Sequence, residues 1–185
     1  MRHTRGYTLI ETLTVITILC IILLFAQSNM SAWRKTQQAE LTYKELKDIV
    51  LNARSHAINS RRSLTLCGSS NGKICDNNWS IGVLLFEDGN RNAVIDEADQ
   101  YISYRPLSLK NATLKWQGFS GSKIIFERMG ITSASNGTFT YCELDKNPLY
   151  SRQVIVSRGG RARLSQDKNG DGFHDNSQGN TIVCP

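Results

Sequence analysis

The chain begins Met1-Arg-His-Thr-Arg-Gly6-Tyr7-Thr-Leu-Ile-Glu11, and from Tyr7 to Ala26 it is almost uninterruptedly apolar. As a helix, a run of about 20 residues would be about 30 Å long, enough to cross the hydrocarbon core of a bilayer. Glu11 is the one carboxylate in this run. A carboxylate at mid-membrane costs on the order of 2.5–3.5 kcal/mol, so its presence here indicates a function for its charge.

Two simpler interpretations of this segment are a secretory signal peptide and a plain membrane anchor. A signal peptide has a shorter apolar core followed by a small-residue cleavage site. Here a glycine precedes the apolar run, and residues 27–30 offer no such site. An anchor fits the length, and Arg2 and Arg5 would stay in the cytoplasm by the positive-inside rule. Neither interpretation explains Glu11.

The order Arg5-Gly6-Tyr7-Thr8-Leu9-Ile10-Glu11 resembles the start of type IV prepilins, including minor pilins and the related pseudopilins of type II secretion. The resemblance implies that a prepilin peptidase cleaves between Gly6 and Tyr7 and that the new amino terminus at Tyr7 is N-methylated. It also implies that Glu11 pairs with the terminal amine of a neighbouring subunit. Such a charge pair offsets the desolvation that each partner alone would suffer.

The chain is long enough for one anchor helix and one globular domain of about 125–150 residues. Its 40% hydrophobic and 21% charged residues are ordinary globular values. The resemblance implies a protein of the bacterial inner membrane with one span and a periplasmic domain, which then joins other major and minor pilins in an extracellular pilus. We expect a leader peptide at 1–6, a transmembrane and filament-core helix at 7–30, and a periplasmic globular domain at 31–185.

Five cysteines occur, of which Cys20 lies in the apolar run as a small lipid- or helix-facing residue. The other four belong to a segment that would face an oxidising compartment, and they allow three disulfide connectivities. Proximity across a Gly/Ser/Asn-rich turn favours Cys67–Cys75, which leaves Cys142–Cys184. A zinc site is the competing interpretation, but no CxxC pair and no convergent histidines support it.

Helical periodicity continues beyond the apolar run. Apolar residues recur at steps of three and four, which predicts an amphipathic helix packed on a sheet: Tyr43, Leu46, Val50, Ala53 and Ala57, widened by Ile49 and Ile58. Lys44, Lys47, Asp48 and Asn52 would occupy its opposite face.

After Arg62 the sequence becomes typical of short strands separated by Gly, Asn, Ser or Asp clusters. A long helix followed by antiparallel strands predicts an α+β fold, and the pilin resemblance implies the same: a long N-terminal helix packed on an antiparallel β-sheet domain. The expected strands are 63–67, 81–86, 101–104, 113–116, 123–126, 138–142, 153–156 and 161–164.

Two polar loops resemble calcium-binding loops. One runs from Asp88 to Asp99, and the other places Asp167, Asn169, Asp171 and Asp175 at the spacing D-x-N-x-D-G-x-x-D. Both lack the bidentate glutamate that completes such a loop. Polar turns produce similar spacings by chance, because Asp, Asn and Gly each favour loops. Calcium is therefore a hypothesis for the second loop, and no other cofactor is expected.

No catalytic constellation is visible. The three histidines, His3, His56 and His174, are scattered and form no triad or metal cluster with other residues. No Gly-rich phosphate loop follows a strand. We therefore expect no enzymatic activity.

Between Asp145 and Asp167 the chain has basic residues and no acidic residue. In a strand, Arg161 and Arg163 would point to the same face about 7 Å apart, a spacing suited to neighbouring phosphates of DNA. Gly160 would let the backbone approach a bulky polyanion. The simpler interpretation is a basic edge strand that is protected against aggregation.

One motif resembles a particular subgroup of this family. Gly160-Arg161-Ala162-Arg163 matches the Gly-Arg-x-Arg motif of FimT-type minor pilins, a group that binds DNA during natural transformation. The Cys67…Cys75 turn and Trp79–Val83 also look like the FimT/FimU/GspH group. Cys184-Pro185 looks more like FimU, a minor pilin that helps prime and join the pilus tip.

The sequence therefore favours a FimT-type minor pilin that binds double-stranded DNA without sequence preference. Arg161 and Arg163 would make the main contacts, with support from Gly160, Arg158, Arg152 and Lys168. Two alternatives stay open: a structural minor pilin that acts in pilus initiation or tip assembly, and a pseudopilin of type II secretion.

Overall fold

The computed structural model describes residues 6–97, 99–107, 109–119 and 121–185, without the side chains of residues 25–29. The chain divides into two compact units, Met1–Gln37 and Gln38–Pro185. One helix, α1 (Leu9–Ser60), contributes to both of them.

In the first unit, α1 begins directly after Thr8. The Glu11 amide donates to the Thr8 carbonyl at 3.1 Å and to the Thr8 hydroxyl at 3.4 Å. Thr8 and Glu11 have the spacing of a capping box, and a carboxylate in the first turn favours the positive end of the helix dipole. Glu11 thus lies in the first turn of α1, and its predicted pairing with a neighbouring subunit stays a prediction.

Threonines inside the apolar run satisfy their hydroxyl groups within the helix. Thr12 donates to the Leu9 carbonyl at 2.9 Å, and Thr17 donates to the Leu13 carbonyl at 2.8 Å. These contacts leave an apolar outer surface, and Cys20 is a free, exposed thiol within it. A transmembrane segment is predicted at 7–30; across the residues that the structure describes, no helix meets the length and hydropathy that a membrane span requires.

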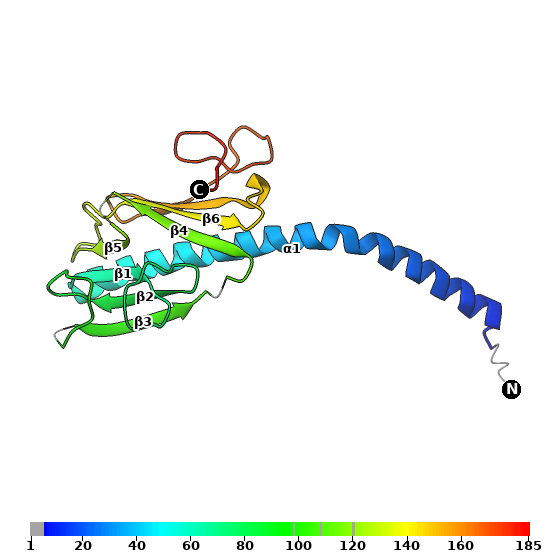
Figure 1. The fold of residues 1–185 in the computed structure, drawn as a ribbon, viewed down its shortest axis with the longest axis horizontal. Coiled ribbons are helices and arrows are strands. Elements are labelled where there is room, and N and C mark those ends of the chain that lie inside the picture. The colour runs from blue at the N-terminus through cyan, green and yellow to red at the C-terminus, as the bar shows by residue number, and fades with distance from the viewer. Residues whose placement is uncertain (1–5, 98, 108, 120) are drawn as a thin grey trace. The chain divides into compact units, whose positions relative to one another are not determined.

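The second unit consists of two four-stranded antiparallel sheets and the last turns of α1, with the strand orders β3-β2-β1-β5 and β4-β6-β7-β8 (Figure 1). The predicted α+β fold is confirmed, and each expected strand is present with ends shifted by at most a few residues. The elements after α1 are β1 (Leu64–Gly68), β2 (Gly82–Glu87), β3 (Gln100–Pro106), β4 (Ala112–Gly118), β5 (Lys123–Phe126), β6 (Gly137–Glu143), the 3-10 helix η1 (Pro148–Tyr150), β7 (Arg152–Val156) and β8 (Ala162–Leu164).

The core lies where the predicted helical stripe meets the sheets. Leu46 and Val50 are fully buried, and each such side chain contributes about 1.5–3 kcal/mol. Trp79 and Trp116 flank Phe139 with ring centroids 4.7 and 4.5 Å away. Ile58 differs from the prediction: it is 43% exposed, and its side chain lies near Gly130 in the loop after β5.

Two disulfides tie down the loops and the end of the chain. Cys67–Cys75 joins β1 to the following loop, and Cys142–Cys184 joins β6 to the penultimate residue, with Cα separations of 5.6 and 5.9 Å. Both pairings are those expected from the sequence. The second closes a loop of 42 residues, which restricts the unfolded chain by about 4 kcal/mol in the chain-entropy model.

Candidate nucleic-acid interface

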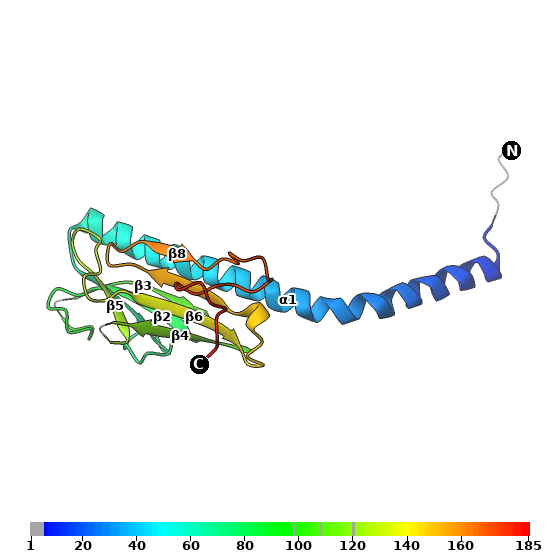
Figure 2. The ribbon, with the colours of Figure 1, turned by 90° about the horizontal axis from the view of Figure 1, so that it is seen from above.

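The basic segment ends in β8, the edge strand of the second sheet. In the sheet order, β8 follows β7, with Ile155 opposite Arg163 and Val156 opposite Ala162. Figure 2 shows β8 running alongside the part of α1 that belongs to the second unit. The strand has three residues, and short charged edges of this kind resist pairing with another chain.

Arg161 and Arg163 share the outer face of this edge. Both side chains are exposed, and they alternate with the half-buried Ala162 and Leu164. This is the strand alternation that the sequence predicts. In the described part of the chain, neither guanidinium has a carboxylate partner, so both are free to bind an external anion.

The turn before β8 is built on Gly160. The Gly160 amide donates to the Ser157 carbonyl at 2.9 Å, and the φ of Gly160 is +70°. A Cβ at this position would collide with the Gly130 carbonyl and touch the Arg54 side chain. Gly160 is buried, so the expectation that it lets the backbone approach a polyanion is wrong. It is required by the turn and by its close contact with the loop after β5.

Arg158 occupies the exposed corner of this turn. Its carbonyl accepts a hydrogen bond from the Thr132 amide at 2.8 Å, which fixes the turn against the 127–133 segment. Its side chain is exposed, so it stays available to support Arg161 and Arg163.

Arg152 is a correction to the predicted site. Its side chain is only 6% exposed, and its Nε donates to Glu40 Oε1 at 2.9 Å. Its Nη1 donates to the carbonyls of Leu149 and Ser151 at 3.0 and 2.9 Å. Arg152 has the same parity in β7 as the buried Val154, so strand alternation turns it toward the interior. It therefore cannot contact DNA.

Glu40 is the partner that the sequence analysis missed. Burial by itself would raise the pKa of its carboxyl, but hydrogen bonds from Arg152 and Lys44, together with the Arg152 charge, hold this pKa below its ordinary value. Glu40 therefore stays ionised and neutralises Arg152.

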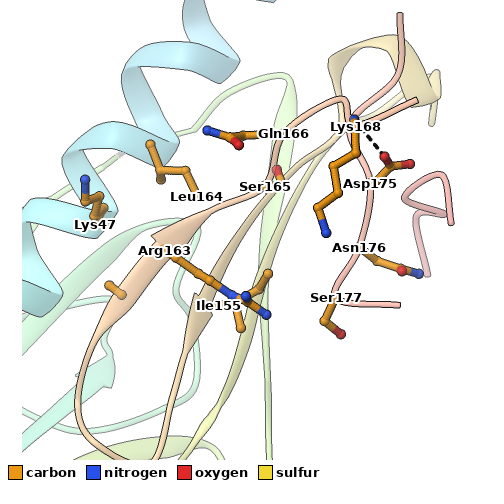
Figure 3. Close-up of a pocket in the computed structure, with 11 residues that line it drawn as sticks. Lys47, Ile155, Arg163, Leu164, Ser165, Gln166, Lys168, Asp175, Asn176 and Ser177 are labelled. Carbon is orange, nitrogen blue, oxygen red and sulfur yellow. Dashed lines mark hydrogen bonds between the residues drawn. The ribbon is translucent and has the colours of Figure 1, made fainter. Parts of the chain in front are cut away.

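A pocket of about 360 Å³ opens beside β8. Arg163 and Lys168 extend into it from β8 and the following loop, and Lys47 borders it from α1 (Figure 3). The sequence analysis placed Lys47 on the face of the helix opposite the apolar stripe. It borders this pocket because β8 lies beside α1. Three cations, from α1, β8 and the loop after β8, thus line one pocket, and Asp175 is the one carboxylate among its lining residues.

The predicted calcium loop at 167–175 uses its carboxylates to cap its own turn. Asp167 accepts hydrogen bonds from the amides of Gly172 at 2.9 Å and Gly170 at 2.7 Å, and these bonds lower the pKa of its carboxyl. Asp175 is buried, and its Oδ2 accepts from the Lys168 amide at 2.9 Å. These contacts also fix the backbone of Lys168 at the pocket.

The loop at 88–99 is held in the same manner. Asp88 is fully buried, and its Oδ2 accepts hydrogen bonds from the Thr65 hydroxyl at 2.7 Å and the Ala93 amide at 2.9 Å. Among the residues with described positions, no three His, Cys, Asp or Glu side chains converge as metal ligands. Both loops are self-capped polar turns.

Comparisons with known proteins agree with the fold. A family model described as type II transport protein GspH matches residues 45–160, and one described as the prokaryotic N-terminal methylation motif matches residues 1–26. No curated protein matches the chain significantly.

Three solved structures of minor pilins and pseudopilins resemble the chain. A crystal structure of the type IV minor pilin FimU from Pseudomonas aeruginosa is 18% identical, covers 74% of this chain and 92% of its own, and has a TM-score of 0.56. A second crystal form of FimU is 19% identical over 70% of this chain and 91% of its own, with a TM-score of 0.52. The minor pseudopilin EpsH from the type 2 secretion system of Vibrio cholerae is 12% identical over 69% of this chain and 95% of its own, with a TM-score of 0.48.

Proposed function

This chain belongs to the family of the type II transport protein GspH, and from that premise we propose that it is a minor pilin that binds DNA through the β8 edge. In this role it serves DNA uptake during natural transformation, and the duplex is held by its phosphates without sequence preference. The chain itself catalyses nothing.

The observation that carries this proposal is the outward pair Arg161 and Arg163 on an edge strand, with no carboxylate partner in the described part of the chain. Guanidinium groups bind phosphate oxygens in a bidentate manner, so two on one face can engage adjacent phosphates. The simpler interpretation, an edge strand protected against aggregation, requires charged residues only on the strand itself. Here Lys168 and Lys47 come from other segments and border the same pocket, which supports a binding role for the surface.

Assembly is the second part of the proposal. The match to the N-terminal methylation motif supports cleavage between Gly6 and Tyr7 and methylation of Tyr7. The chain would enter the inner membrane first, with its second unit in the periplasm. Glu11 would then pair with the terminal amine of a neighbouring pilin as subunits join the pilus.

The experiment that tests DNA binding uses the full-length chain in neutral detergent and a short fluorescent duplex. Arg161→Gln with Arg163→Gln should remove most of the affinity. Lys73→Gln with Lys110→Gln, which removes the same charge from exposed sites elsewhere, should retain it. About four phosphate contacts, from Arg158, Arg161, Arg163 and Lys168, predict a log–log salt slope of about −3 to −4. Equal binding by the two variants would exclude this interface.

A structural minor pilin without DNA binding is the second candidate. The observation that favours it is the Cys142–Cys184 disulfide, which fixes the carboxyl end in the arrangement that resembles FimU. Deletion of the gene separates the candidates. Loss of DNA uptake with pili present favours the DNA-binding role, and loss of pili favours the structural role. Loss of protein secretion favours a pseudopilin.

A further inference from the structure

A second basic hollow lies at the carboxyl end of α1. It has a volume of about 370 Å³, and four arginines from three segments line it. Two follow α1, one lies in the β2–β3 loop and one follows β5. We call this site the arginine pocket: Arg61, Arg62, Arg91 and Arg128.

The arginine pocket carries a large excess of positive charge. Its one lining carboxylate is Glu87, which is buried and paired with Arg62 Nη1 at 3.3 Å. Arg91 is oriented by a hydrogen bond from its Nε to the Ser63 hydroxyl at 3.2 Å. Arg61 and Arg128 have exposed side chains without a carboxylate partner among the described residues. A concave site lined by one sign of charge focuses the field on an incoming anion.

The backbone of Arg61 supports a functional role. Its φ is +54°, in the left-handed region where glycine is the usual residue after a helix end. An arginine here is strained relative to glycine, and strained residues concentrate at binding sites. The conformation holds a charged side chain at the rim of the pocket.

One short segment joins this pocket to the β8 turn. Arg128 lines the pocket, and two residues later the Gly130 carbonyl lies against Gly160 and accepts a hydrogen bond from Arg54 Nε at 3.1 Å. Two residues further on, the Thr132 amide donates to the Arg158 carbonyl. The short segment 128–132 therefore links the arginine pocket to the turn before β8.

We propose that the arginine pocket is a second phosphate-binding site, which takes a backbone phosphate of the same DNA duplex that β8 holds. This inference rests on the proposed function and extends its site. Forked guanidinium groups are suited to phosphate oxygens. Once one site holds the duplex, the other site meets the same duplex at a high effective concentration. Two sites that are weak by themselves therefore bind the duplex more tightly together.

The test measures duplex affinity of the full-length chain in neutral detergent at low and physiological salt. Arg91→Gln with Arg128→Gln should weaken binding about tenfold at low salt and reduce the salt slope by about 1, as for one lost phosphate contact. Lys73→Gln with Lys110→Gln is the control of equal charge. Binding by the pocket variant at the control level overturns the inference, whereas loss in the Arg161/Arg163 variant leaves the proposed function intact. A wild-type chain without affinity overturns both.

A second measurement needs no variant. Phenylglyoxal modifies accessible arginines, and mass spectrometry reports the rate at each site with and without duplex. Arg91 and Arg128 should be protected together with Arg161, while Arg105 on β3, paired with Glu45 at 3.6 Å, serves as the unprotected reference. Unchanged reactivity of Arg91 and Arg128 overturns the inference. So does a pocket variant that binds DNA normally but is lost from pili, which would assign the arginines to an acidic surface of a neighbouring subunit.

Discussion

Arg152 Nε donates to Glu40 Oε1 across 2.9 Å and so joins β7 to α1, although the two residues lie 112 positions apart. The pair holds the second sheet on the helix, and it lies next to an edge-on contact between the buried Tyr43 and the half-buried His174, whose ring centroids are 6.0 Å apart. The most buried arginine of the basic segment thus stabilises the fold, and the exposed arginines remain for binding.

Arg152→Met should destabilise the second unit strongly and leave the DNA affinity of the folded protein unchanged. Breaking a buried ion pair costs about 3–5 kcal/mol, and we expect the lower end because Glu40 is partly exposed. Unfolding in urea, followed by the fluorescence of the buried Trp79 and Trp116, measures the loss. The double variant with Glu40→Leu should lose less than the sum of the two single variants. If the stability losses of the two single variants simply add up in the double variant, the two side chains do not stabilise the fold as a pair.

Stability should fall as the pH drops below about 6.5. Burial, and then the charge of Arg152, lower the pKa of His174, whose Nδ1 lies 2.9 Å from the Ser165 hydroxyl. The unfolded chain, with an ordinary histidine pKa, then binds more protons than the folded chain, so the stability decreases with falling pH. Urea midpoints at pH 7.5 and 5.5 measure the effect, and His174→Gln should remove most of it. Equal midpoints in the wild type would contradict the assignment.

Gly160→Ala should destabilise the turn before β8 by about 1–3 kcal/mol. The new Cβ meets the Gly130 carbonyl, and the φ of +70° is unfavourable for alanine. Gly159→Ala is the matched control, because its nearest neighbour would be the Ser157 hydroxyl at 4.0 Å. Thermal unfolding of both variants gives the comparison. If the two variants melt alike, the close contact with Gly130 is unimportant.

Removal of the Cys142–Cys184 disulfide by serine substitution at both positions should cost about 2–4 kcal/mol. The loss arises chiefly because the unfolded chain regains the freedom of a 42-residue loop. Cys20→Ser should leave the stability of the second unit unchanged, since this thiol is free and exposed. Urea unfolding under non-reducing conditions checks both variants. An unaltered midpoint for the double serine variant would show that the bridge is not a stabilising one.

Processing at the amino terminus should depend on Gly6 and not on Glu11. Gly6→Val should leave the full leader in place, whereas Glu11→Gln should be cleaved but fail to enter pili, because its side chain cannot neutralise a terminal amine. Intact-mass spectrometry and immunoblots of sheared pili report the two steps. Recovery of the wild-type chain with Met1 still present, in cells that process their other pilins, would refute this path.

The order of the helix and the strands along the chain could be predicted from local sequence patterns. Steps of three and four in Tyr43, Leu46 and Val50 require one helical face, and that face is buried. Alternation around Arg161 and Arg163 likewise placed both side chains outside. The same rule applied to Arg152, Val154 and Val156 would have turned Arg152 inward, because these three share a parity in β7.

Sequence by itself determined the amino-terminal motif, the helical stripe, the strands and the outward arginine pair, because each depends on residues that are neighbours along the chain. Tertiary structure decided which basic side chains are available to bind an anion. Lys47 reaches the β8 pocket, Arg152 is neutralised by Glu40, and Arg128 joins Arg61 at the end of α1. These outcomes depend on how sheets dock on a helix, and the charge of a side chain does not indicate what will lie opposite it.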